Sequence, residues 1–139
     1  MKRLATISVA ALVLLAACGG AAAPAAQSGG TVAVTLTDNS ISPIPASVSA
    51  GKVTFKITNA GSIEHEFVVL KTSLAADKIP ANPDKPGKVL EDGNVGEVEG
   101  IAVKATKDLS LDLQPGSYVL ICDLPAHYEM GMHTAFTVK

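Results

Sequence analysis

From residue 31 onward, short runs of alternating apolar and polar residues are separated by clusters of turn-forming residues. A period of two is typical of β-strands with one face in a core, because successive side chains point to opposite faces. The runs lie at residues 31–37, 52–59, 64–71, 99–104, 107–113, 117–122 and 134–138. Turn residues such as Asp38-Asn39-Ser40 and Pro115-Gly116 separate them. No run has the period of an amphipathic helix of ordinary length. The pattern therefore predicts an all-β Greek-key sandwich or barrel of about seven to eight strands.

Residues 72–96 interrupt this regular spacing. The segment is rich in proline, glycine and charged residues and has little β pattern. We expect at most one helical turn, at residues 74–77. The acidic residues near its end indicate a solvated face, with partner docking as the alternative; they are Glu91, Asp92, Glu97 and Glu99. A loop of this length tends to be functional or mobile, and the sequence leaves its role open.

The first 18 residues have the features of a targeting signal. Lys2 and Arg3 precede a short apolar stretch, and Leu15-Ala16-Ala17-Cys18 resembles the lipobox of bacterial lipoproteins. We expect residues 1–17 to be a lipoprotein signal peptide and Cys18 to be lipidated. The alternative is an ordinary secretory signal with a chance cysteine at its end. Residues 18–30, composed of Gly, Ala, Pro, Gln and Ser after the cysteine, are expected to form a flexible tether, and 31–139 the folded domain.

This interpretation predicts an exported protein, lipid-anchored to a bacterial membrane on its periplasmic or outer cell-surface side. Loss of Lys2 and Arg3 with the signal leaves nine basic residues against 13 acidic ones, a net formal charge of −4. Nucleic acid is excluded as a partner, because neutralising phosphates requires a basic face. Membrane attachment is expected through acyl chains and not through a polybasic patch.

Once Cys18 is lipidated, Cys122 is the remaining thiol. A free thiol in an oxidising compartment is prone to oxidation unless a metal or another group occupies it. The other soft or imidazole donors of the mature chain are His65 and a cluster close to Cys122, namely His127, Met130, Met132 and His133. A thiolate, imidazoles and a thioether together indicate copper. Zinc sites rarely use methionine, and calcium and magnesium prefer oxygen.

Strand parity indicates which of these donors meet inside the fold. Met132 has the parity of the core-facing residues of the last predicted strand, and His65 and Cys122 have that of their own strands. His133 and Glu66 have the opposite parity and are expected to point outward. The inward-pointing donors are therefore the candidate ligands.

The spacing Cys122-x4-His127-x4-Met132 closes as one loop between neighbouring strands, and His65 comes from a distant strand. With Pro115-Gly116-Ser117-Tyr118 before the cysteine and Ala-Gly-Lys-Val-Thr-Phe at 50–55, the pattern resembles the cupredoxins, blue copper proteins of the plastocyanin, azurin and auracyanin type. The resemblance covers residues 31–139. It implies one Cu(I)/Cu(II) ion per chain, bound strongly by Cys122, His65 and His127. Met132 is the implied weak axial ligand, with Met130 as its competitor.

The resemblance also implies an electron-exchange surface. His127 would form a partly exposed edge of the site, inside an apolar rim that docks a transient redox partner. The rim residues are Pro125, Ala126, Met130 and Gly131. Glu66 departs from the family pattern, because many members have Asn, Ser or Asp after the first histidine. Its effect on the surroundings of the metal is left open.

These features predict a monomeric carrier of single electrons between redox partners at the extracytoplasmic face of a membrane. Catalysis is not indicated, because the site has no open coordination position and no general base. The alternative is a copper carrier for delivery or copper tolerance, although thiolate ligation suits retention better than release. A third class, a copper-free scaffold or adhesion domain, conflicts with the intact ligand set.

Overall fold

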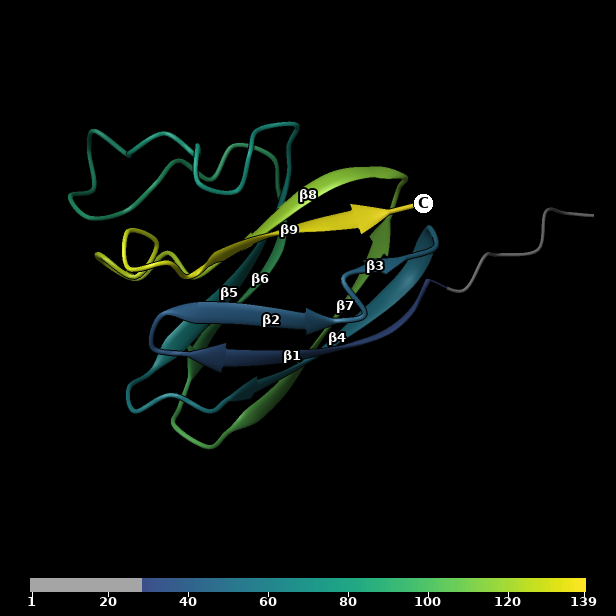
Figure 1. The fold of residues 1–139 in the computed structure, drawn as a ribbon, viewed down its shortest axis with the longest axis horizontal. Helices are drawn as coiled ribbons and strands as arrows, with labels where there is room; N and C mark the ends of the chain where they lie inside the picture. Colours follow the sequence, from purple (N-terminus) through teal and green to yellow (C-terminus); the bar gives the residue numbers. More distant parts are fainter. Residues whose placement is uncertain (1–28) are drawn as a thin grey trace, which may run out of the picture.

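The computed structural model describes residues 29–139, so the predicted signal peptide, Cys18 and residues 18–28 of the tether lie outside the described residues. Nine strands form two facing sheets (Figure 1). One sheet has the order β2-β1-β4-β7 and comprises β1 (Gly30–Thr37), β2 (Ser40–Ile44), β4 (Gly51–Asn59) and β7 (Thr106–Leu113). The other has the order β3-β9-β8-β5-β6 and comprises β3 (Ser47–Val48), β5 (His65–Lys71), β6 (Asn94–Ile101), β8 (Gly116–Ile121) and β9 (His133–Val138).

The predicted all-β sandwich is thereby confirmed. Strand β1 pairs in parallel with β4, and β3 with β9, whereas the other pairs are antiparallel. Residues 29–139 contain no helix, and so none that is long and apolar enough to cross a membrane.

The core lies between the two sheets and is centred on three phenylalanines. Phe55 on β4 lies 5.4 Å, between ring centroids, from both Phe67 on β5 and Phe136 on β9. None of the three side chains is more than 1% exposed. They have the inward parity that the period of two predicts, and their tilted and edge-on rings are the favoured geometry for aromatic pairs.

Two features of the strand prediction are wrong. The short strands β2 and β3 were not expected, because their serine- and proline-rich sequences, SISPI and SV, lack an alternating pattern. The strand expected at 99–104 is instead β6, which ends at Ile101. Val103 continues the apolar alternation, but Lys104 has a φ of 65°, which ends the extended backbone in a turn.

The segment between β5 and β6 covers the outer face of the second sheet. Ile79 and Val89 from this segment pack with Tyr128 of the loop after β8 and with outward-facing apolar side chains of the sheet; these are Val68, Leu70, Val119 and Ile121. Strand β5 is therefore buried on both faces except at its last residue. The expected helical turn at 74–77 is wrong, because the backbone there makes only a local turn closed by the Lys78 N–H donating to the Ala75 carbonyl at 2.9 Å.

Candidate metal centre

The four predicted ligands lie at one end of the sandwich. His65 is the first residue of β5, and Cys122 directly follows the last residue of β8. His127 and Met132 belong to the loop of residues 122–132 that joins β8 to β9. His65, Cys122 and Met132 are completely buried, and His127 is 7% exposed.

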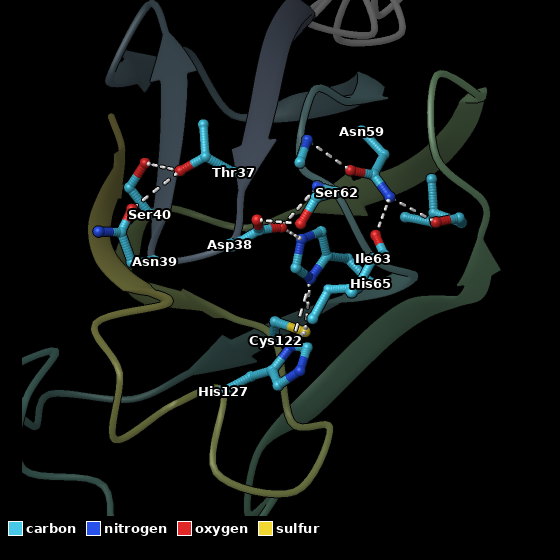
Figure 2. Close-up of polar contacts among 12 residues, drawn as sticks. Thr37, Asp38, Asn39, Ser40, Asn59, Ser62, Ile63, His65, Cys122 and His127 are labelled. Carbon is cyan, nitrogen blue, oxygen red and sulfur yellow. Dashed lines mark hydrogen bonds and ion pairs between the residues drawn. The ribbon is translucent and has the colours of Figure 1, made fainter.

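The strong donors converge on one point. The Nδ1 atoms of His65 and His127 are 3.2 Å apart. The Sγ of Cys122 lies 3.3 Å from the Nδ1 of His127 and 4.0 Å from that of His65. Figure 2 shows the sulfur beside both rings, with both imidazoles turned toward it. Three strong donors brought together from β5, the end of β8 and the following loop form a group that could hold a metal ion.

Backbone hydrogen bonds fix the shape of the ligand loop. The Cys122 N–H donates to the Met132 carbonyl at 3.0 Å, and the Met132 N–H donates to the His127 carbonyl at 3.1 Å. Gly131 has a φ of 108°, and a Cβ there would lie 2.9 Å from the Asn39 carbonyl oxygen, so only glycine suits this turn. These bonds tie three of the ligands to one another without a metal.

Tyr128 ties the same loop to the covering segment. Its hydroxyl donates to the Ala76 carbonyl at 2.6 Å and accepts the Ile79 N–H at 3.0 Å. The Ala126 N–H donates to the Gly87 carbonyl at 2.7 Å. The segment between β5 and β6, whose role the sequence left open, is thus hydrogen-bonded to the metal-binding loop and supports it.

Burial separates the two methionines that competed for the axial position. Met132 is 0% exposed and belongs to the same core cluster as Cys122, whereas Met130 is 51% exposed. Met132 is therefore the thioether that is buried in the core with Cys122, whereas Met130 faces solvent.

The protonation chemistry of the donors suits a metal cation. Burial, followed by the neighbouring His65, lowers the pKa of His127, so its imidazole is neutral near pH 7 and has a free lone pair. Burial raises the pKa of the Cys122 thiol, although the Glu66 N–H donates to its Sγ at 3.4 Å. A cation would displace the thiol proton and compensate the buried thiolate charge. Buried thiolate, imidazole and thioether donors together fit one type 1 copper ion.

Asp38 contacts a ligand ring, and the sequence did not single it out. Its Oδ1 lies 3.2 Å from the Nε2 of His65, the ring nitrogen that faces away from the other donors (Figure 2). A carboxylate at Nε2 places the proton there and leaves Nδ1 unprotonated for the metal. Asp38 lies in the turn between β1 and β2, where the sequence indicated only turn chemistry.

Further hydrogen bonds hold this carboxylate in place. Ser62 donates to it from its backbone N–H at 2.8 Å and from its hydroxyl at 2.6 Å, and these bonds lower the pKa of Asp38. Asn59 shapes the Ser62 turn by accepting the Gly61 N–H and donating to the Ile63 carbonyl, both at 2.8 Å. A Cβ on Gly61 would collide with Asp38 and lie 2.7 Å from the Nε2 of His65. The turn is therefore built around the His65–Asp38 contact.

We expect Asp38→Asn to weaken Cu(II) binding about tenfold and to raise the reduction potential. The amide keeps the shape of the side chain but removes a negative charge that stabilises the oxidised site more than the reduced one. Chelator competition and voltammetry would measure the two effects. Asp112→Asn, which removes an exposed carboxylate on β7, is the matched control. Equal behaviour of the two variants would show that Asp38 does not act on His65.

Two neighbours of the ligands differ from their expected surroundings. Glu66 does point away from the core, but it is 5% exposed instead of solvated. Burial raises its pKa, against the opposing effect of Lys88. His133 is only partly exposed, with its ring centroid 4.8 Å from that of Tyr128 and the two rings tilted. In both cases the reason is the covering segment and the ligand loop, which pack over the outer face of the sheet.

The comparisons with known proteins agree with the two-sheet sandwich. The family model of the cupredoxin-like domain matches residues 7–138, and the chain belongs to this family. Among curated proteins, none matches the chain.

The fold is similar to three solved cupredoxins. The sodium-dithionite-reduced auracyanin of the photosynthetic bacterium Roseiflexus castenholzii is 20% identical, with a TM-score of 0.62 over 81% of this chain and 99% of that one. The rusticyanin of Thiobacillus ferrooxidans is 18% identical, with a TM-score of 0.56 over 81% and 79% of the two chains. An azurin of the obligate methylotroph Methylomonas sp. strain J is 19% identical, with a TM-score of 0.57 over 78% and 97%. At such identities the likeness establishes the shared fold.

Proposed function

We propose that the protein carries single electrons between redox partners at the extracytoplasmic face of a bacterial membrane. The observation that carries this proposal is the closed donor group of Cys122, His65 and His127, whose donor atoms lie 3.2 to 4.0 Å apart inside a family sandwich. When bound, copper supplies a one-electron Cu(II)/Cu(I) couple. The protein supplies donors whose positions are fixed by hydrogen bonds.

Rigid, buried ligands favour electron carriage over copper delivery. His65 is held by Asp38, and Cys122 and His127 each share a backbone hydrogen bond with Met132. A site fixed in this way changes little when the charge of the metal changes, which favours rapid exchange of electrons. Releasing the ion to another protein would require these bonds to break.

The proposed route for electrons is the edge of His127. His127 is 7% exposed as a residue, whereas the other three ligands are 0% exposed. Pro125, Ala126 and Met130 are exposed beside it, and Gly131 is partly exposed. An uncharged rim of small area suits brief docking of a redox partner.

The lipid anchor at Cys18, the exported location and the monomeric state are part of this proposal. They rest on the lipobox-like sequence at 15–18, on the Gly- and Ala-rich tether and on the apolar, uncharged character of the rim. A tethered electron carrier would diffuse close to the membrane and meet membrane-bound partners there.

Titration of the purified protein with Cu(II), followed by visible absorption and electron paramagnetic resonance, tests this function. We expect an intense visible band that saturates at one copper per chain and is bleached reversibly by a mild reductant. Copper binding without the band, or binding of Cu(I) alone, would instead support copper delivery.

We expect Met132→Leu to keep copper and the visible band but to raise the reduction potential by on the order of 60 mV, about a tenfold change in relative affinity for the two oxidation states. Leucine has no lone pair to donate to the more positive oxidised ion. Voltammetry of Met132→Leu beside Met130→Leu would measure the shift. A larger shift in Met130→Leu would reverse the assignment of the axial ligand.

A further inference from the structure

A second group of potential ligands lies on the outer side of the second sheet, directly behind the copper ligands. It consists of Glu66, which follows His65, of Asp123, which follows Cys122, and of Glu91 from the covering segment. Each of the three carboxylates offers an oxygen within 4.8 Å of the other two. Glu66 and Asp123 are 5% and 1% exposed, and Glu91 lies at the partly exposed rim.

The charges of this carboxylate group are poorly compensated. Burying a carboxylate is costly unless it is paired and hydrogen-bonded. Among the described residues, the cation recorded in contact with the group is Lys88, whose Nζ lies 3.9 Å from the Oε1 of Glu66. The Lys88 side chain is 26% exposed, so this ion pair is long and open to water. With all three carboxylates ionised, the group and one ammonium carry an excess of two negative charges.

Each carboxylate also retains an oxygen for a ligand. The Oε1 of Glu66 is buried and has no hydrogen-bond partner among the described residues. The Val89 N–H donates to the Oδ1 of Asp123 at 2.7 Å, which leaves Oδ2. The Asn94 side chain donates to the Oε2 of Glu91 at 3.2 Å, which leaves Oε1. A buried oxygen without a hydrogen bond, on one of three converging carboxylates, is the arrangement that a cation would complete.

We propose that Glu66, Glu91 and Asp123 bind one hard divalent cation, of the Mg²⁺, Ca²⁺ or Mn²⁺ class, beside the copper site. Carboxylate oxygens are the ligands that these ions prefer, whereas the thiolate and imidazoles select copper. The carboxylate group and the copper ligands therefore select different metals, although both include a residue of β5 and a residue that follows β8. Two charges on the cation match the two excess negative charges of the group.

The second part of the inference rests on the proposed electron-carrier function. The Glu66 N–H donates to the Sγ of Cys122 at 3.4 Å, and Asp123 is bonded to Cys122 through the backbone. A cation at this position adds positive charge close to the thiolate and disfavours Cu(II) more than Cu(I). Binding of the cation therefore raises the reduction potential, and by linkage reduction of copper tightens binding of the cation.

The first experiment uses the copper-loaded protein kept reduced with ascorbate, because Cu(I) gives no paramagnetic resonance signal. Addition of MnCl2 is followed by the loss of the signal of free Mn²⁺. We expect one bound Mn²⁺ per chain. Glu91→Gln should weaken binding at least tenfold, whereas Asp92→Asn, the exposed neighbour in the same segment, should leave it unchanged. Lys88→Met should tighten binding, because it removes a competing cation.

The second experiment measures the reduction potential with and without saturating Mn²⁺. We expect a rise in the wild type and a smaller or absent rise in Glu91→Gln. If a protein with an intact copper band bound no stoichiometric Mn²⁺, the cation site would be overturned. A proton or Lys88 would then compensate the charge of the carboxylate group. Equal affinities in Glu91→Gln and Asp92→Asn would overturn the cation site as well. Mn²⁺ binding without a shift in potential would overturn only the coupling between the cation and the reduction potential. A missing copper band would contradict the electron-carrier function but would leave the Mn²⁺ titration valid.

Discussion

Replacing Cys122 by Ser is expected to abolish the intense visible band at every copper concentration. The band arises from charge transfer between a thiolate and Cu(II), and a serine hydroxyl stays protonated and gives no such transition. The change is close to isosteric, and the residue is 0% exposed. The fold should therefore persist, and Cu(II) affinity should fall by at least about a hundredfold, because the soft ligand is lost. Visible spectroscopy with chelator competition would measure both effects.

His133→Ala is the matched control for this variant. His133 is another metal-binding residue type at the same end of the sandwich, but its ring packs at a tilt against Tyr128, and within residues 29–139 it belongs to no group of converging donors. Its loss should leave the band in place. A coloured Cys122→Ser protein, or a colourless His133→Ala protein, would mean that the ligands are assigned wrongly.

The largest loss of stability is expected from Phe55→Ala. Phe55 is 0% exposed and contacts Phe67 and Phe136, so truncation leaves a cavity between the two sheets. Such substitutions cost about 3–5 kcal/mol, a large share of the roughly 5–15 kcal/mol that stabilises a typical domain. Urea denaturation of the copper-free protein would measure this loss, because bound metal adds its own stabilisation.

Ile44→Ala provides the comparison. This side chain is 72% exposed at the end of β2, so the free energy of unfolding should change by no more than about 0.5 kcal/mol. If the two variants lost similar stability, the phenylalanine cluster would not be the centre of the core.

The ligand set could be predicted from the sequence because local rules selected the candidate donors and the resemblance to the cupredoxins implied their roles. The period of two placed His65 and Cys122 on inward faces, and the spacing of the donors placed His127 and Met132 on one loop. Both rules apply within one strand or one loop, so they can be used without knowing how the two sheets pack. The burial of Met132 and the exposure of Met130 agree with this reasoning.

The residues that surround the ligands could not be predicted in this way. Asp38 reaches His65 from 27 positions away, through the pairing of β1 with β4 and the turn after β4. Glu66 has the outward parity of a solvated residue, yet the segment between β5 and β6 covers it. The turn at Lys104 was missed because its neighbours alternate like a strand. Tertiary packing decides the contact of Asp38 and the burial of Glu66, and backbone conformation decides the turn at Lys104. Neither produces a recognisable pattern in the neighbouring sequence.

The pairing of β5 also bears on the order in which the chain assembles. His65 and Cys122 are 57 positions apart in the sequence. Strand β5, which carries His65, pairs on one side with β8, and β8 lies near the end of the chain. During synthesis from the N-terminus, β1, β2 and β4 emerge early, whereas the two strands that flank the thiolate emerge last. Contacts this distant along the chain form slowly. The donors can therefore come together only once β8 and the following loop are present, and a polypeptide that ends before β8 contains His65 alone of the four ligands.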